Sequence, residues 1–108
     1  MSRLASGLWV QAYLMRLQIE TIPAYVLAHG DDTAGAIMVK LSPLDGTARL
    51  YQRMMAMDGS RPWDVLADGP EPEVDALIAR QRKTDPDLWV IEVESRDGRH
   101  LLDQPGLD

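Results

Sequence analysis

The N-terminal stretch from residue 4 to residue 21 carries more apolar side chains than one face of a surface helix can hold. Val10, Leu14 and Leu17 recur at the i, i+4, i+7 spacing of a helix. Six further apolar residues widen this stripe: Leu8, Trp9, Ala12, Tyr13, Met15 and Ile19. A helix that is apolar on most sides is normally buried. The stretch therefore predicts a helix that either lies across a sheet under a covering loop or meets another chain.

We expect an interface on this helix at Trp9, Tyr13 and Arg16. Tryptophan is enriched among the residues that contribute most to association, and Trp9 lies on the over-wide apolar side of the predicted helix. The sequence therefore predicts a protein partner or a homo-oligomer.

The middle of the chain alternates between strand patterns and turn residues. Residues 24–29, 36–41 and 48–54 have the apolar or alternating patterns of strands, and the turns between them are rich in Gly, Asp and Pro. The Asp45-Gly46 pair is a hairpin signal. Residues 56–72 contain two glycines and three prolines, which predicts an irregular loop.

The C-terminal part predicts one helix and one or two strands. Residues 72–83 carry acidic side chains at their start and basic side chains at their end, the order that the helix dipole favours. Residues 88–94 alternate clearly as a strand, and residues 99–102 could return as a short one.

These elements predict a single α+β domain. The expected order is a helix, a three-stranded antiparallel meander, a helix, and one or two further strands, all in a single mixed sheet. We expect the domain to span residues 1–102 and residues 103–108 to form a flexible tail.

Composition excludes several classes of site and partner. Cysteine is absent, which removes disulfides, thiolate metal sites and cysteine nucleophiles and suits a reducing compartment. The net charge of −6 disfavours nucleic acid, whose phosphates need neutralising. The apolar run from Leu8 to Leu17 is interrupted by Gln11 and Arg16 and is too short for a membrane span. We expect a soluble, acidic, cytoplasmic protein that binds neither nucleic acid nor membranes.

Three segments resemble the DUF1491 family of small bacterial proteins of unknown function. They are LASGLWVQAYLMR near the N-terminus, AGAIMVK followed by LDGTARLY in the middle, and DPDLWVIEVESRDGRHLL near the end. Together they cover most of residues 3–102, and the resemblance lies in their order rather than in any chemical motif. It implies a compact, stand-alone bacterial protein, with no established activity or catalytic residues to carry over.

The predicted order of elements also matches the core of restriction-endonuclease-like nucleases. Those enzymes hold a divalent metal with one acid at the second strand and with a second acid two residues before a lysine. Here Asp31 and Asp32 precede the second predicted strand and Lys40 ends it, but Met38 stands two residues before Lys40. The catalytic dyad is missing, so a nuclease-like fold without that activity remains one alternative.

A carboxylate-based hydrolase is the other alternative. Glu92 and Glu94 share one face of the last clear strand, and Asp85 and Asp87 flank its start. Paired carboxylates act as acid and base when their environments differ, and either Lys40 or His100 could assist them. A solvated strand face and a helix-ending turn explain the same residues.

No complete set of metal ligands is visible, because His29, Asp31 and Asp32 fit a polar turn better than a cation site. We therefore expect no metal and no cofactor. The sequence favours a non-catalytic interaction or accessory protein over an enzyme.

Overall fold

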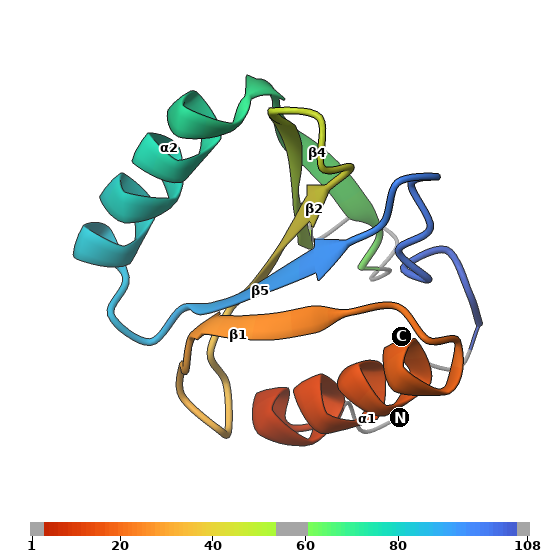
Figure 1. Cartoon of the computed structure of the whole chain (residues 1–108). Coiled ribbons are helices and arrows are strands. Elements are labelled where there is room, and N and C mark those ends of the chain that lie inside the picture. The colour runs from red at the N-terminus through yellow and green to blue at the C-terminus, as the bar shows by residue number, and fades with distance from the viewer. Residues whose placement is uncertain (1–3, 54–60, 106–108) are drawn as a thin grey trace.

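The computed structural model describes residues 4–53 and 61–105. In these ranges the chain forms two helices and five strands. Their bounds are α1 (Ser6–Ile19), β1 (Ala24–Ala28), β2 (Ile37–Ser42), β3 (Thr47–Arg53), β4 (Trp63–Pro70), α2 (Glu71–Thr84) and β5 (Trp89–Glu94). The strands form one sheet, and the two helices cover its opposite faces (Figure 1).

The order of the strands in the sheet is β1-β5-β2-β3-β4. β5 is antiparallel to β1 and parallel to β2, and β2, β3 and β4 form an antiparallel meander. The predicted α+β class and the single mixed sheet are confirmed. The meander was expected to consist of the first three strands, β1, β2 and β3. It consists of β2, β3 and β4 instead, because β5 lies between β1 and β2. Every residue of β2 is buried and β5 is nearly as apolar, so these two strands take the centre.

The prediction of an irregular loop over residues 56–72 is wrong for its second half. β4 pairs antiparallel with β3, from Trp63 opposite Arg53 to Pro70 opposite Thr47. Gly69 and Pro70 are tolerated because β4 is an edge strand and they lie at its end. Residues 56–60 lie outside the described part of the chain. The predicted short strand over residues 99–102 is irregular in this structure.

The core has one layer on each face of the sheet. On the α1 face the buried side chains are Trp9, Val10, Tyr13, Leu17, Ile22, Ile37, Val39, Leu41, Tyr51, Trp89, Ile91, Val93 and Leu101. On the α2 face they are Ala28, Met38, Ala48, Leu50, Val74, Ile78, Leu88 and Val90. The alternation of side chains along β2 and β5 therefore supplies both layers.

The loop between β1 and β2 joins the start of α1 to the start of β5. Carbonyl groups of the loop accept hydrogen bonds from the first free N–H groups of α1, those of Ser6 and Gly7. The indole of Trp89 donates a hydrogen bond to the Asp31 carbonyl at 2.8 Å. Gly30 packs so closely on β5 that a Cβ atom there would lie 2.3 Å from the Asp87 carbonyl oxygen. The loop is thus a packed structural element.

Neither described helix has the length and apolar character that a membrane span requires. Of the tail predicted over residues 103–108, residues 103–105 are described. The Arg16 Nη1 atom donates a hydrogen bond to the carbonyl of Pro105 at 2.7 Å. The flexibility of the tail and the boundary of the domain stay predictions.

Candidate functional site

Lys40 is surrounded by three carboxylates on the α2 face of the sheet. Its Nζ atom lies 2.8 Å from Glu71, 2.7 Å from Asp75 and 2.9 Å from Glu92. Glu92 stands directly opposite Lys40 on β5, while Glu71 and Asp75 lie one turn apart at the start of α2. The lysine side chain is only 4% exposed. The cluster therefore ties the first turn of α2 to the two central strands.

The Lys40 ammonium is held in its charged form. Burial by itself lowers the pKa of Lys40, but the hydrogen bonds that its ammonium donates to Asp75, Glu71 and Glu92 outweigh this effect and raise the pKa above its ordinary value. A lysine of this kind is no general base, because its lone pair is protonated. The ammonium occupies the centre of the carboxylates, where a bound cation would otherwise sit. No group of three or more His, Asp or Glu residues that could hold a metal ion occurs in residues 4–53 and 61–105.

The other proposed hydrolase residues lie apart from Lys40. Asp85 and Asp87 form the turn after α2, where the Asp87 N–H donates to the Asp85 carboxylate at 3.1 Å. Glu94 accepts a hydrogen bond from Tyr25, and this bond raises the pKa of Tyr25. His100 lies on the α1 face of the sheet. Of the six candidates, the structure thus brings Lys40 and Glu92 together in one cluster and Asp85 and Asp87 together in a separate turn. Glu71 and Asp75, the other partners of Lys40, were not among the predicted site residues.

His100 is held on three sides. Its ring packs on Tyr51 with the ring centroids 4.8 Å apart. Its Nδ1 atom accepts the Leu102 N–H at 2.9 Å, and its carbonyl accepts the Tyr13 hydroxyl at 2.7 Å. Burial lowers the pKa of His100, Asp103 opposes this shift and Arg49 adds to it, so the net pKa is lowered. The imidazole is therefore neutral near pH 7.

The residues expected at an interface on α1 are placed differently. Trp9 and Tyr13 are buried, with their rings stacked 4.9 Å apart, and Trp9 also packs on Trp63 at 5.4 Å. They lie in the core because they point toward the sheet. Arg16 is half-buried and contacts Pro105. Trp9 and Tyr13 therefore offer no exposed surface in this structure, while the meeting of α1 with another chain stays a prediction.

The opposite side of α1 is apolar and open. Leu8, Met15 and Ile19 are 53%, 63% and 72% exposed, and the half-buried Ala12 lies between them. We call Leu8, Ala12, Met15 and Ile19 the outer stripe. Their spacing of four, three and four residues keeps them on one side of the helix. Leu8, Met15 and Ile19 are exposed there, while Ala12 lies at the border of the stripe and packs against the buried core of the α1 face. This spacing can be read from the sequence, but the sequence analysis chose Trp9 for the interface because of its residue type.

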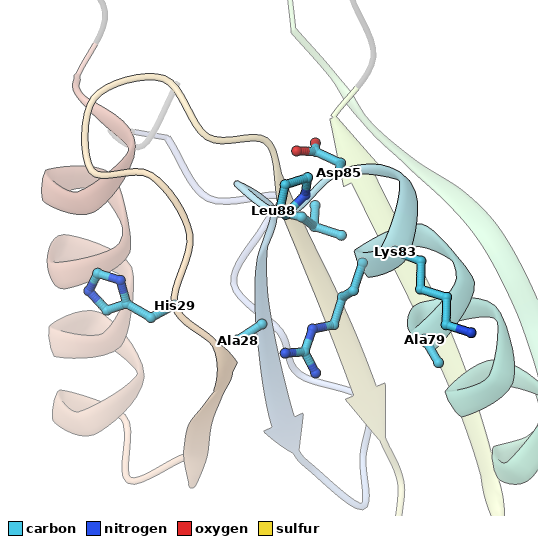
Figure 2. A pocket seen from close by; sticks show the side chains of 8 residues that line it. Ala28, His29, Ala79, Lys83, Asp85 and Leu88 are labelled. Carbon is cyan, nitrogen blue, oxygen red and sulfur yellow. The ribbon is translucent and has the colours of Figure 1, made fainter.

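A hollow of about 370 Å³ lies between the end of β1 and the end of α2. Its lining is Ala28, His29, Ala79, Arg82, Lys83, Asp85, Pro86 and Leu88. Figure 2 shows the His29 ring turned away from Ala28 and Leu88, and the Lys83 amine directed outward along α2. Two cations at the C-terminal end of a helix are what its dipole favours. The hollow has charged side chains at its rim and no converging catalytic groups.

Comparison with known proteins gives one family. The model of the family described as "Protein of unknown function (DUF1491)" matches residues 4–103. The chain is similar to the crystal structure of a DUF1491 family protein from Caulobacter crescentus CB15 and to the NMR structure of a DUF1491 family protein from the same organism. The identity is 40% with a TM-score of 0.86 for the crystal structure, over 94% of this chain and 97% of that chain. For the NMR structure the values are 39% and 0.84, over 97% of each chain.

The solution structure of protein Atu0922 from A. tumefaciens is also similar. It shares 32% identity and a TM-score of 0.73 over 87% of each chain. No curated protein matches the chain.

Proposed function

We propose that this chain, which belongs to the DUF1491 family of proteins of unknown function, is a non-catalytic interaction protein of the cytoplasm. Its docking surface is the outer stripe of α1, and its partner there is a second copy of the chain. The observation that carries the proposal is the exposure of Leu8, Met15 and Ile19, each of which is more than half open to solvent.

The energetic reason is that α1 is apolar around most of its circumference. One side of α1 already packs on the sheet through Val10, Tyr13 and Leu17. The outer stripe repeats that pattern on the far side. A helix that is apolar on most sides is normally buried. Covering exposed apolar area gains about 25 cal/mol per Å². A partner on the outer stripe therefore gains free energy without rearranging the fold.

The low charge of α1 permits a second copy as that partner. The chain carries a net charge of −6, so two copies repel each other at long range unless their contact surface is neutral. The only charged residue between Ser6 and Ile19 is Arg16, and Gln11 and Gln18 border the outer stripe. The outer side of α1 is therefore a surface through which two acidic copies can approach without facing like charges.

The spacing of the outer stripe is also symmetric. Intervals of four, three and four residues read the same from either end, as a two-fold contact between antiparallel helices requires. In such a pair Leu8 meets Ile19 of the second copy, and Ala12 meets Met15 of the second copy. The small Ala12 side chain leaves room for the long Met15 side chain, so the stripe complements itself.

The alternative of a carboxylate hydrolase has weaker support. Its residues need to converge on one pocket, whereas the six candidates lie at the Lys40 cluster, at the turn after α2, beside Tyr25 and beside Tyr51. The charged Lys40 is already bound by three carboxylates.

Light scattering coupled to size-exclusion chromatography tests the proposal. We expect the wild-type protein to elute at twice its chain mass of 12.1 kDa. Leu8→Glu should return it to the monomer with native-like far-ultraviolet dichroism, because a two-fold contact receives the new charge twice. Val65→Glu is the matched control, since Val65 is 43% exposed on β4, away from the stripe. It should remain a dimer.

A mixture of two variants tests the antiparallel arrangement. Leu8→Glu and Ile19→Lys should each be monomeric alone and should form a heterodimer when mixed, because the two new charges then face each other. A monomeric wild type at high concentration contradicts the proposal. Equal loss of dimer in Val65→Glu does so as well.

A further inference from the structure

A second cleft, independent of the outer stripe, opens on the α1 face of the sheet. It lies between the β2–β3 hairpin, β4 and residues 96–100, and has a volume of about 440 Å³. Small-molecule sites commonly measure about 300–1,000 Å³. Its lining includes Leu41, Pro43, Arg49, Tyr51, Arg96 and His100. The cleft is therefore large enough for a small ligand and combines apolar surface with hydrogen-bond donors.

His100 presents a fixed donor to this cleft. Its Nδ1 atom is occupied by the Leu102 N–H, and its ring is held against Tyr51. In the neutral imidazole the other nitrogen, Nε2, then carries the proton. A ligand in the cleft therefore meets an N–H donor whose direction is set before binding.

The backbone beside His100 is strained and is fixed by packing. Leu101, the next residue, has a φ of +61°, in the left-handed region that side chains other than Gly rarely adopt. The buried Leu101 side chain and the hydrogen bond from Tyr13 to the His100 carbonyl fix this conformation. Strained conformations of this kind persist where packing enforces them, and they gather at binding sites.

Both carboxylates that line the cleft are already hydrogen-bonded within the protein. Asp68 is engaged by Arg49, whose Nε and Nη2 atoms donate to one carboxylate oxygen at 3.1 and 2.9 Å. Asp97 accepts the Ser95 hydroxyl at 2.7 Å. Among the described residues Arg96 is exposed, with no hydrogen-bond or ion-pair partner. Arginine has five N–H donors and no acceptor, so both arginines retain donors for a ligand.

We propose that this cleft binds a small organic anion. Its carboxylate or phosphate group is held by Arg96, Arg49 and His100, and its apolar part rests on Leu41 and Pro43. Charged hydrogen bonds from arginine to such groups are among the strongest in proteins. The cleft is a compact hollow enclosed by four short segments of the chain, and not an extended groove. We therefore expect the ligand to be a free small molecule.

Binding should be visible at His100 itself. The charged and titratable groups of the cleft and beside the His100 ring are Arg49 and Tyr51 on β3, Asp68 on β4, Asp103 on the C-terminal segment, and Arg96 and Asp97 on the loop after β5. A bound anion adds a negative charge to this set and favours the protonated imidazole. The pKa of His100 should therefore rise when the ligand binds. His29, the other histidine, lies near Trp89 outside the cleft and should not respond.

An NMR titration tests the proposal with two probes, inorganic phosphate and acetate, against sodium chloride at equal ionic strength. We expect saturable shifts at residues 96–100 and at the His100 ring. Arg96→Gln should weaken binding about tenfold, because it removes a charged hydrogen bond. Arg82→Gln, in the hollow of Figure 2, is the matched control and should bind as the wild type does.

The two probes distinguish the two kinds of anionic group. Saturation by phosphate alone identifies a phosphate-bearing ligand, and saturation by acetate alone identifies a carboxylate. His100→Gln retains an N–H donor and should bind better than His100→Phe, provided both variants melt as cooperatively as the wild type. Shifts that chloride reproduces overturn the proposal. Binding that survives Arg96→Gln unchanged overturns it too.

Discussion

Replacing Lys40 with methionine tests whether the carboxylate cluster stabilises the fold. Methionine keeps most of the length and apolar volume of the lysine stem, so the change removes the charge and little packing. It leaves Glu71, Asp75 and Glu92 facing one another without a cation. The variant therefore isolates the electrostatic contribution of a single buried ammonium.

The expected loss is about 3 kcal/mol of unfolding free energy. Removing one partner of a buried ion pair costs about 3–5 kcal/mol, because the other charge stays buried and unpaired. Here the loss lies at the lower end of that range. Glu92 is 20% exposed and Asp75 52%, so water solvates part of the orphaned charge. The three carboxylates still repel one another, which keeps the loss well above that of a surface pair.

Urea unfolding followed by tryptophan fluorescence measures this loss at a fixed protein concentration. With a slope of about 1.5 kcal/mol per M for a chain of this size, the midpoint should fall by about 2 M. Arg49→Met is the control, because the Arg49–Asp68 pair is half exposed and should contribute no more than about 1 kcal/mol. A midpoint shift no larger than that of the control refutes the reasoning.

Two further predictions concern packing and pH. Gly30→Ala should lower the unfolding free energy by about 2 kcal/mol or more, since its Cβ atom would overlap the backbone at Asp87. Gly69→Ala, with nothing within 4 Å, should be near neutral in the same urea assay. Stability should fall as the pH rises above about 10, because the pKa values of Lys40 and Tyr13 are raised in the folded chain and the unfolded chain loses those protons first. Urea midpoints that stay constant between pH about 8 and about 11 would contradict this.

Local sequence patterns predicted those helices and strands that show a single clear signal, such as alternating apolar residues or an ordered distribution of charge. The alternation of Trp89, Ile91 and Val93 predicted β5, and the charge order along residues 72–83 predicted α2. β4 was missed because Gly69 and Pro70 were interpreted as loop residues, whereas an edge strand tolerates both. The insertion of β5 between β1 and β2 is a long-range pairing. No local pattern encodes it, because all three strands are apolar enough to pair in several orders.

In the candidate sites, too, the sequence indicated single residues but not the long-range contacts between them. The surplus of apolar residues in the first helix was visible in the sequence, but tryptophan was chosen by residue type, and Trp9 proved to face the core. Lys40 and Glu92 were both named, yet as catalytic groups. Their true neighbours Glu71 and Asp75 come from a helix that is distant in sequence. The cleft beside His100 depends on the φ of one leucine, which no sequence pattern reveals.

The place of β5 in the sheet has a consequence for how the chain assembles as it is synthesised. β2, β3 and β4 are consecutive, and each can pair with the next as soon as it is made. β1 has β5 as its neighbour in the described sheet, so it waits until residues 89–94 exist. Pairings of such high contact order form slowly, and until then β1 has no strand beside it and the α1 layer lacks Trp89, Ile91 and Val93. The N-terminal part of the domain is therefore made first and folds last.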